Sequence, residues 1–185
     1  MEAEPGTAVA TREPAMVLIS PETIQAITTN IQLAEQMVTR VLSPEVDYGQ
    51  VVGIRGKILF DPGAAKIMAA FNCYARHRVL RYSTEGQMTC IIQAEIVDRN
   101  SQQVVAMGIG AASTTESKWK YRWVSDPVEY GFPMEIVPTL KTRERNHQME
   151  YRIPNPEEGD LVHTLAAMAA KRAEVDAVRS LPGVG

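Results

Sequence analysis

Aromatic and cationic side chains alternate over residues 118–123, in the run KWKYRW. The cations are Lys118, Lys120 and Arg122, and the rings are those of Trp119, Tyr121 and Trp123. Nucleobases stack on such rings, for about 1–3 kcal/mol per base, while neighbouring cations neutralise phosphates. The pattern is therefore typical of a groove for single-stranded nucleic acid. A half-buried element with a solvated basic face has the same alternation, so both interpretations stay open.

A second cationic segment spans residues 53–81. It contains one acid, Asp61, and six cations: Arg55, Lys57, Lys66, Arg76, Arg78 and Arg81. Six cations and one acid give this segment a net charge of +5, within a chain whose net charge is −3. A local excess of this kind attracts a polyanion even where the total charge repels it. Scattered, solvated cations are the alternative interpretation.

Other kinds of site have little support in the sequence. His77, His147 and His163 share no metal-binding spacing, and Cys73 and Cys90 form no CxxC pair. No glycine-rich stretch matches a nucleotide-binding motif, and no nucleophile or pair of acids has catalytic spacing. We therefore expect a protein that is not an enzyme and that uses no metal, disulfide or cofactor.

The composition fits a single globular domain. The chain has 185 residues, of which 45% are hydrophobic and 22% charged, enough to build a real core. The start has no signal-peptide pattern, and no apolar run approaches the roughly 20 residues that span a bilayer. We expect a soluble cytoplasmic protein with no membrane segment. Residues 1–15 have little to bury and are predicted to form a disordered tail before a domain over 16–185.

Three helices are predicted from capping residues and apolar spacing. The first, over about 21–42, has Ser20 as N-cap. The second, over about 62–72, has Asp61 as N-cap before Pro62 at the first helical position. The last has Asn155 as cap and Pro156 at the first helical position, and it ends before the sequence LPG.

A β-meander is predicted between the second and the last helix. Strands are predicted over about 76–83, 87–98 and 103–111. The middle strand has the period-2 pattern of a strand with one buried face, and the sequence TEGQ between the first two strands is typical of a hairpin turn. Gly108 and Gly110 lie on one face of the third strand, which indicates either a close approach of another backbone or a bulge.

The element that carries residues 118–123 stays open between two alternatives. Ser113 and Glu116 have capping-box spacing, which predicts a helix from about residue 114, although KWKYRW also fits a strand. Residues 124–156 contain five prolines and are predicted to be a long, partly irregular insertion. The expected fold is therefore α+β: a three-stranded antiparallel meander packed against helices, with an N-terminal helix and a long insertion.

The sequence resembles a family of phage and prophage single-strand annealing and single-stranded DNA-binding proteins. The matching stretches are VDYGQVVG (46–53), ILFDPGAAKI (58–67), GIGAASTTESKWKYRW (108–123) and NPEEGDLVHTLAAMAAKRAEVDAV (155–178). More remotely, a meander followed by a helix ending in K-R-A-x-x-D-A resembles the β-β-β-α core of the Rad fifty-two superfamily. That resemblance implies ring-forming or filament-forming subunits with single-stranded DNA in an outer basic groove.

The resemblance also assigns roles to residues. It implies that Lys118, Lys120 and Arg122 are groove cations and that Arg55 and Lys57 lie on an adjoining hairpin. Lys171 and Arg172 match the family's basic pair on the last helix, where the role is either DNA binding or structural. All the nucleic-acid-binding residues that we expect are Arg55, Lys57, Lys66, Arg76, Arg78, Lys118, Trp119, Lys120, Tyr121, Arg122, Trp123, Lys171 and Arg172.

Two functions follow as hypotheses. The first is a homo-oligomeric protein that binds single-stranded DNA and promotes annealing of complementary strands in recombination. The second is a phage-encoded adaptor that binds a host protein through the surface of Trp119 and Trp123, without binding nucleic acid.

Overall fold

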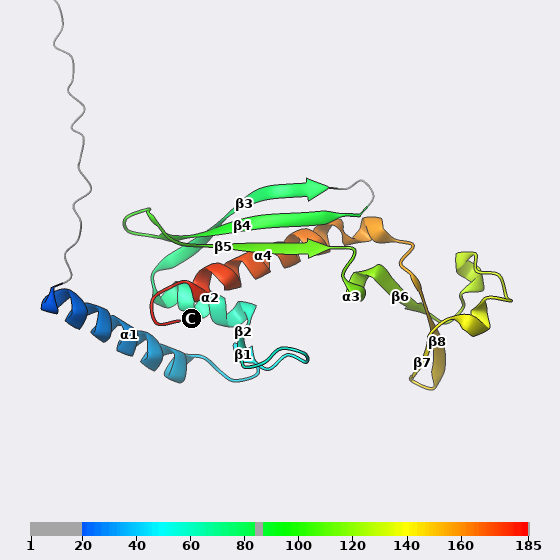
Figure 1. Ribbon diagram of the computed structural model, residues 1–185, viewed down its shortest axis with the longest axis horizontal. Coiled ribbons are helices and arrows are strands. Elements are labelled where there is room, and N and C mark those ends of the chain that lie inside the picture. The colour runs from blue at the N-terminus through cyan, green and yellow to red at the C-terminus, as the bar shows by residue number, and fades with distance from the viewer. Residues whose placement is uncertain (1–19, 84–86, 185) are drawn as a thin grey trace, which may run out of the picture.

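The computed structural model describes residues 20–83 and 87–184. The predicted tail over 1–15 and most of the predicted TEGQ turn lie outside the described residues. Figure 1 shows a sheet covered on one side by helices, with a small second sheet at one end. The α+β class and the antiparallel meander predicted from the sequence are confirmed.

The meander consists of β3 (Cys73–Ser83), β4 (Thr89–Asp98) and β5 (Val104–Ser113), in the order β3-β4-β5. All neighbouring strands are antiparallel, and the first strand begins three residues earlier than predicted. Alternate residues of β4 are buried, as the apolar alternation predicts, because one face of the sheet packs against a helix. The register places Ile92 opposite Gly110 and Ala94 opposite Gly108.

That helix is α4 (Val162–Arg179), which lies along the buried face of the meander (Figure 1). It presents three alanines at intervals of four residues, Ala169, Ala173 and Ala177, and all three are fully buried. A Cβ added to Gly110 would lie 2.1 Å from the Ala169 carbonyl oxygen, and one added to Gly108 would lie 2.2 Å from the Ala177 amide nitrogen. The predicted close backbone approach at these glycines is confirmed.

The N-terminal helix α1 (Pro21–Val41) begins as predicted. The Ser20 hydroxyl accepts a hydrogen bond from the Thr23 amide, and Pro21 occupies the first turn. Ala34 is buried, whereas Ile24 and Ile27, near the start of the helix, are 55% and 52% exposed. Only the later part of α1 therefore packs on the rest of the described chain.

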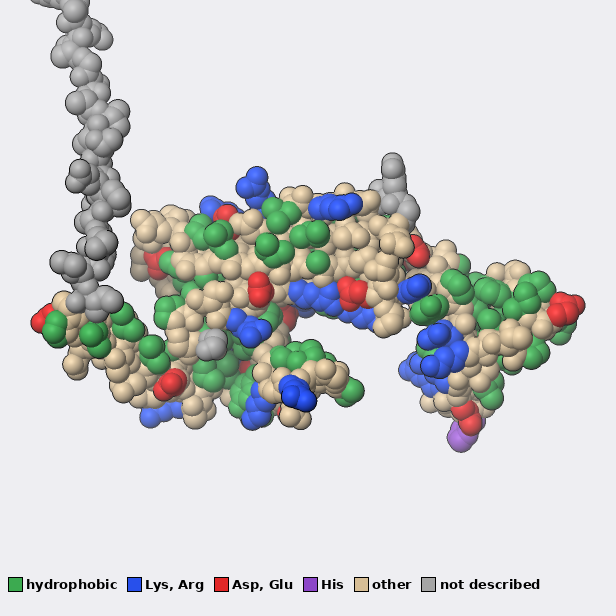
Figure 2. All heavy atoms as spheres, viewed as in Figure 1, with side chains coloured by type: hydrophobic (Ala, Val, Ile, Leu, Met, Phe, Trp, Pro, Cys, Tyr) green, Lys and Arg blue, Asp and Glu red, His purple; other side chains and the backbone are tan. Residues whose placement is uncertain are grey.

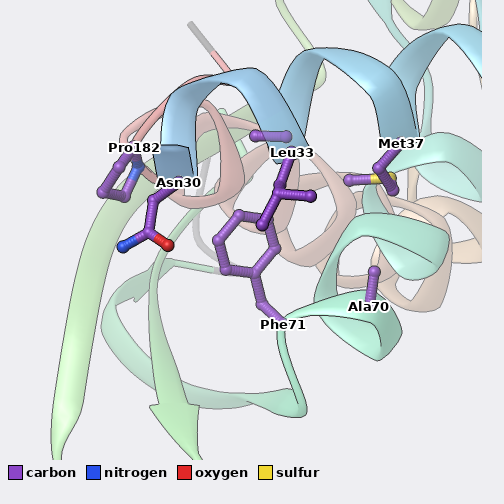
Figure 3. Close-up of a pocket in the computed structure, with 7 residues that line it drawn as sticks. Asn30, Leu33, Met37, Ala70, Phe71 and Pro182 are labelled. Carbon is purple, nitrogen blue, oxygen red and sulfur yellow. The ribbon is translucent and has the colours of Figure 1, made fainter. Parts of the chain in front are cut away.

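A groove of about 360 Å³ lies where α1 meets α2 (Asp61–Ala70). Figure 3 shows Leu33 of α1 directed toward Phe71 and Met37 lying above Ala70. Pro182, after the end of α4, closes another side of the groove. The later turns of α1 are therefore held by α2 and by the segment that follows α4.

The second helix starts one residue earlier than predicted. Asp61 is its first residue, Phe60 is the capping position, and no side chain caps the helix. The Asp61 carboxylate instead pairs with Lys171 of α4, at 2.9 Å. Its predicted role as N-cap is therefore wrong. Before α2, the short strands β1 (Tyr48–Gly49) and β2 (Ile58–Leu59) form an antiparallel hairpin with a loop over 50–57.

Residues 114–124 combine the two alternatives of the sequence. The Ser113 amide donates to the Glu116 side chain at 3.2 Å, but Ser113 does not cap a helix. The helix is the single turn α3 (Ser117–Lys120), with Glu116 at its capping position and no side-chain cap. The chain then extends as β6 (Tyr121–Val124). The run KWKYRW is thus divided, and Trp119 and Trp123 lie on different elements.

Much of the segment predicted to be irregular is a regular hairpin. Strand β7 (Thr142–Arg145) pairs with β8 (Gln148–Pro154), and β8 pairs with β6, giving the antiparallel order β6-β8-β7. Asn146 and His147 both have positive φ, which is the geometry of a two-residue type I′ turn. Short 3₁₀ turns, η1 (Val128–Tyr130) and η2 (Val137–Thr139), precede the hairpin.

The small sheet has a buried centre of its own and two adjacent connections to the main body. Val124 and Ile153 are 7% and 0% exposed and lie outside the main core cluster. The chain enters the sheet after Lys120 and leaves it at Asn155, whose amide donates to the Lys120 carbonyl at 3.0 Å.

The last helix starts later than predicted. A 3₁₀ turn, η3 (Glu158–Leu161), precedes α4, so Pro156 is not its first residue. The Asn155 side chain donates to the Trp119 carbonyl at 3.2 Å and accepts from the Glu157 amide. This asparagine therefore fixes the junction with α3 and does not cap α4. Within the described chain, none of the helices has the length and apolar character needed to cross a bilayer.

Candidate nucleic-acid interface

A groove of about 530 Å³ separates the β1–β2 hairpin from α4. Apolar side chains such as Ile58 and Val175 line it, together with the cations Lys171, Arg172 and Arg179 of α4 and the acids Asp61 and Asp176. Figure 2 shows blue side chains below the meander, on the hairpin and on the side of the small sheet that faces the hollow between them. Further cations lie along the upper edge of the meander in the same view, and acidic side chains lie among those below it.

The hairpin loop contributes two exposed cations, as the resemblance implies. Lys57 lies over the ring of Tyr48, with Nζ 5.4 Å from the ring centroid. No acid of the described chain pairs with Arg55. Both positive charges therefore remain available to an anionic ligand.

Lys66 anchors the hairpin and is not a free groove cation. Its Nζ lies 2.6 Å from Oδ2 of Asp47, whose side chain is fully buried and also accepts from the Ser43 amide at 2.7 Å. The hydrogen bond from Lys66, with the one from Ser43, holds the pKa of Asp47 below its usual value. The expected role of Lys66 in binding nucleic acid is therefore not supported by its position.

The same anchor depends on a glycine. A Cβ at Gly63, in the first turn of α2, would lie 2.3 Å from the Asp47 carbonyl oxygen. The Phe60 amide donates to that oxygen at 2.8 Å. The backbone around Asp47 therefore fits against the start of α2, and the hairpin that carries Arg55 is held at the edge of the groove.

Arg172 has a structural position. Its guanidinium donates to both carboxylate oxygens of Glu116, each at 2.8 Å, and to the Ala111 carbonyl. The Arg172 guanidinium is the main cause that lowers the pKa of Glu116. Through these bonds Arg172 joins α4 to the corner between β5 and α3. Its donors are therefore already used and are not free to bind a phosphate. Of the two roles left open for this residue, the contacts favour the structural one.

Lys171 and Asp176 also take part in contacts that hold α4 in place. Lys171 pairs with Asp61, although both side chains are partly exposed. Oδ2 of Asp176 accepts from the Ile109 amide at 3.0 Å, on the outer edge of β5. Together with the bond from Arg172 to Ala111, this contact gives hydrogen-bond partners to backbone groups on the free edge of β5. Those groups could otherwise pair with another strand.

Trp119 is not an accessible ring. It is 9% exposed and belongs to the main core cluster. Nζ of Lys118 lies 3.8 Å from its ring centroid, and the Arg172 guanidinium lies 5.9 Å away. Partial burial, and then the charge of Arg172, lower the pKa of Lys118. The expected stacking of bases on Trp119 therefore conflicts with its burial, although Lys118 itself reaches the surface.

Tyr121 and Trp123 have a different environment. Both are half-buried on β6 of the small sheet, and each has an arginine over its ring. The Arg152 guanidinium lies 4.2 Å from the Tyr121 centroid, and the Arg143 guanidinium lies 4.4 Å from the Trp123 centroid. Lys120 lies 5.5 Å from the Tyr121 centroid. The predicted juxtaposition of rings and cations is thus present here.

Two arginines of this group were missed by the sequence reasoning. Arg143 and Arg152 lie in the segment predicted to be irregular, where no face of a strand could be assigned. The available signal was the alternation of Arg143 and Arg145 before the turn at Asn146. Arg122, in contrast, lies on the other face of β6 and pairs with Glu157.

Arg76 and Arg78 lie on the side of the meander away from α4. The register places them opposite Glu95 and Gln93, which alternate with the β4 residues that pack on the helix. Arg76 pairs with Glu95 at 2.7 Å, and Arg78 is exposed. The structure therefore does not bring these two cations to the groove with the others.

The remaining nucleophiles and metal-ligand types form no cluster. Cys73 and Cys90 are free and buried, and burial raises the pKa of both thiols. His77 pairs with Glu174 at 2.9 Å. Across residues 20–83 and 87–184, no group of three or more histidine, cysteine or acidic side chains could hold a metal ion.

The chain matches no family model, and no curated protein or solved structure matches it either. The resemblance carried by the sequence motifs therefore remains an expectation. What the described residues bring together is the hairpin loop, the exposed face of α4 and the small sheet, all on one side of the molecule (Figure 2).

Proposed function

We propose that the protein binds single-stranded DNA and promotes the annealing of complementary strands, with a fold related to the Rad fifty-two superfamily. The observation that carries this proposal is a set of cations on two neighbouring elements: Lys171, Arg172 and Arg179 on the α4 side of the groove, and Arg55 and Lys57 on the hairpin loop. Arg55, Lys57 and Arg179 have no acid partner within the described chain, and Lys171 shares its charge with Asp61 at the surface. A polyanion would be drawn to this side despite the net charge of −3.

Annealing requires binding but no bond chemistry. A protein that binds phosphates through exposed lysine and arginine side chains leaves the base edges free to pair with a second strand. Cations of α4 and apolar side chains both line the groove. This combination suits a flexible strand whose phosphates contact the cations.

Self-association with further copies of this chain is part of the proposal, because one groove holds only a short stretch of strand. On α1, apolar residues recur at two heptad positions: Ile24, Ile31 and Val38 at one, and Ile27, Ala34 and Val41 at the other. A repeat of seven is typical of helices that pair with other helices. Ile24 and Ile27 are 55% and 52% exposed, so the start of this stripe is largely uncovered by the described chain.

The proposal is tested by titrating a labelled thymidine oligonucleotide and following fluorescence anisotropy at several salt concentrations. We expect log K to fall linearly with log salt concentration. Replacing both Arg55 and Lys57 with alanine should weaken binding and reduce the slope by about 1.4, because each phosphate contact on a single strand contributes about 0.7.

The matched control removes two cations from the far face of the meander, Arg78→Ala with Arg81→Ala. This variant changes the net charge equally, so we expect it to keep nearly the wild-type slope. Absence of binding, or binding that does not respond to salt, would contradict the proposal. An equal effect of both double variants would mean that total charge, and not the groove, governs binding.

The adaptor hypothesis is less well supported. It requires Trp119 and Trp123 to form one surface, but Trp119 is buried in the core and Trp123 lies on the small sheet.

A further inference from the structure

We propose that the face of the small sheet carrying Tyr121 and Trp123 is a base-stacking site, separate from the phosphate-binding groove. This inference rests on the proposed function and extends it. The groove beside α4 would hold the backbone of a single strand, and the small sheet would hold its bases. Four residues of β6, β7 and β8 make up the site: Tyr121, Trp123, Arg143 and Arg152.

The strand register places these four side chains on one face. Trp123 is opposite Arg152, Tyr121 is opposite Pro154, and Arg143 is opposite Glu150. Glu150, Arg152 and Pro154 alternate along β8, and alternate residues of a strand share a face. All four members therefore project to the same side of the sheet.

Each ring on this face is paired with a planar guanidinium. Arg143 is held over Trp123 by its ion pair with Glu150, at 2.6 Å, and Arg152 lies over Tyr121 without an acid partner in the part of the chain that is described. Bases stack both on aromatic rings and on guanidinium planes, so each pair offers two kinds of stacking surface. With Arg145 included, three arginines and one acid give this face a local charge of +2.

The sheet does not need these rings for its own core. Val124 and Ile153 lie on the opposite face and supply the buried centre. Tyr121 and Trp123 are instead half-buried, which leaves part of each ring open to solvent. Proteins that bind single-stranded nucleic acid with little sequence preference use aromatic rings interleaved with cations on a solvent-facing surface.

The test compares two probes of the same length: a thymidine oligonucleotide, and an abasic oligonucleotide with the same phosphates but no bases. Trp119 and Trp123 are the two tryptophans of the chain, and Trp119 is buried. We expect the thymidine probe to quench tryptophan emission and to bind about fivefold or more tightly than the abasic probe. The abasic probe should bind the groove with little quenching.

Two variants assign the effect to the small sheet. Trp123→Phe should abolish the quenching and preserve the preference for thymidine, because a ring remains. Tyr121→Ala with Trp123→Ala should remove the preference and leave affinity for the abasic probe unchanged. Tyr130→Ala, which removes an exposed ring outside the sheet, is the control and should behave as the wild type. If the double variant fails to fold, Trp123→Phe still decides the location of the quenching.

The outcomes separate this inference from the proposed function. Equal affinity for the two probes without quenching would overturn base stacking and leave single-strand binding intact. Failure of both probes to bind would overturn the proposed function and the inference with it. Quenching by an acidic, tryptophan-free peptide but not by the thymidine probe would overturn the inference, because it would identify a protein-binding surface.

Discussion

Glycine and alanine residues determine how closely α4 approaches the meander. Gly108 and Gly110 leave no room for a side chain, and the alanines of α4 face them with single methyl groups. This packing explains why the helix is rich in alanine: a larger residue at Ala173 would push the helix away from the sheet. The groove cations on the same helix are positioned by this contact.

Gly110→Ala is expected to destabilise the fold by about 1–3 kcal/mol or more, because its Cβ would overlap backbone atoms of α4 that cannot move independently. Urea unfolding followed by circular dichroism measures the change. Gly159→Ala is the matched control, since a Cβ there meets no atom within 4 Å. Equal stabilities of the two variants would contradict the packing described for Gly110.

The ion pair of Asp47 and Lys66 should make stability depend on pH. The folded-state pKa of Asp47 lies below its unfolded value of about 3.9, so its contribution is complete above about pH 5 and declines as the pH falls through the folded-state pKa. Asp47→Asn should therefore lower the melting temperature at pH 6 more than at pH 3. Asp160→Asn, at an exposed position, is the control. A destabilisation by Asp47→Asn that is the same at both pH values would show that the carboxylate charge is not what matters.

The sequence identifies the candidate binding residues by type, but it does not reveal their ion pairing. Arg55 and Lys57 are exposed on the hairpin loop, and Tyr121 and Trp123 are half-buried on the small sheet. Arg172 is instead saturated by Glu116, which is 56 positions away in the chain. Such partners are set by the packing of distant elements, and no local pattern reports them.

Among the elements, those with strong periodicity or capping signals were predictable. The meander and α1 lie within a few residues of their predicted bounds, because alternation and the Ser20 cap act locally. The hairpin of β7 and β8 was missed, since neighbouring prolines favour irregular structure and His147 occupies a turn position where glycine is the usual signal. The groove cations could be assigned to elements, whereas the arginines of the missed hairpin could not.

The exposed stripe on α1 predicts self-association. Ile24→Glu with Ile27→Glu should shift the protein to smaller assemblies, because charges in a helix-pairing seam are costly to bury. Light scattering coupled to size-exclusion chromatography measures the mass. Gln25→Glu with Gln32→Glu adds the same charge on the opposite side of α1 and should leave the mass unchanged. A wild-type protein that is monomeric at every concentration would contradict this prediction.

At the scale of the whole molecule, the side on which each cation lies follows from three-dimensional packing. Arg76 and Arg78 follow the hairpin cations closely in sequence, yet the meander places them on its far face. Alternation within β3 predicts that they share a face, but only the position of α4 decides which face is distant from the groove. The distribution of charge over the surface therefore could not be predicted from the sequence.

The hydrogen bond between Lys120 and Asn155 means that the small sheet leaves and rejoins the chain at nearly one point. Residues 121–154 could consequently be deleted and the two ends joined by a few glycines, with little displacement of the meander or α4. Such a shortened protein would separate the two proposed kinds of binding. It should still bind phosphates but should no longer prefer strands that carry bases over abasic strands. A small sheet attached in this way could be exchanged for another during evolution without changes in the meander or α4.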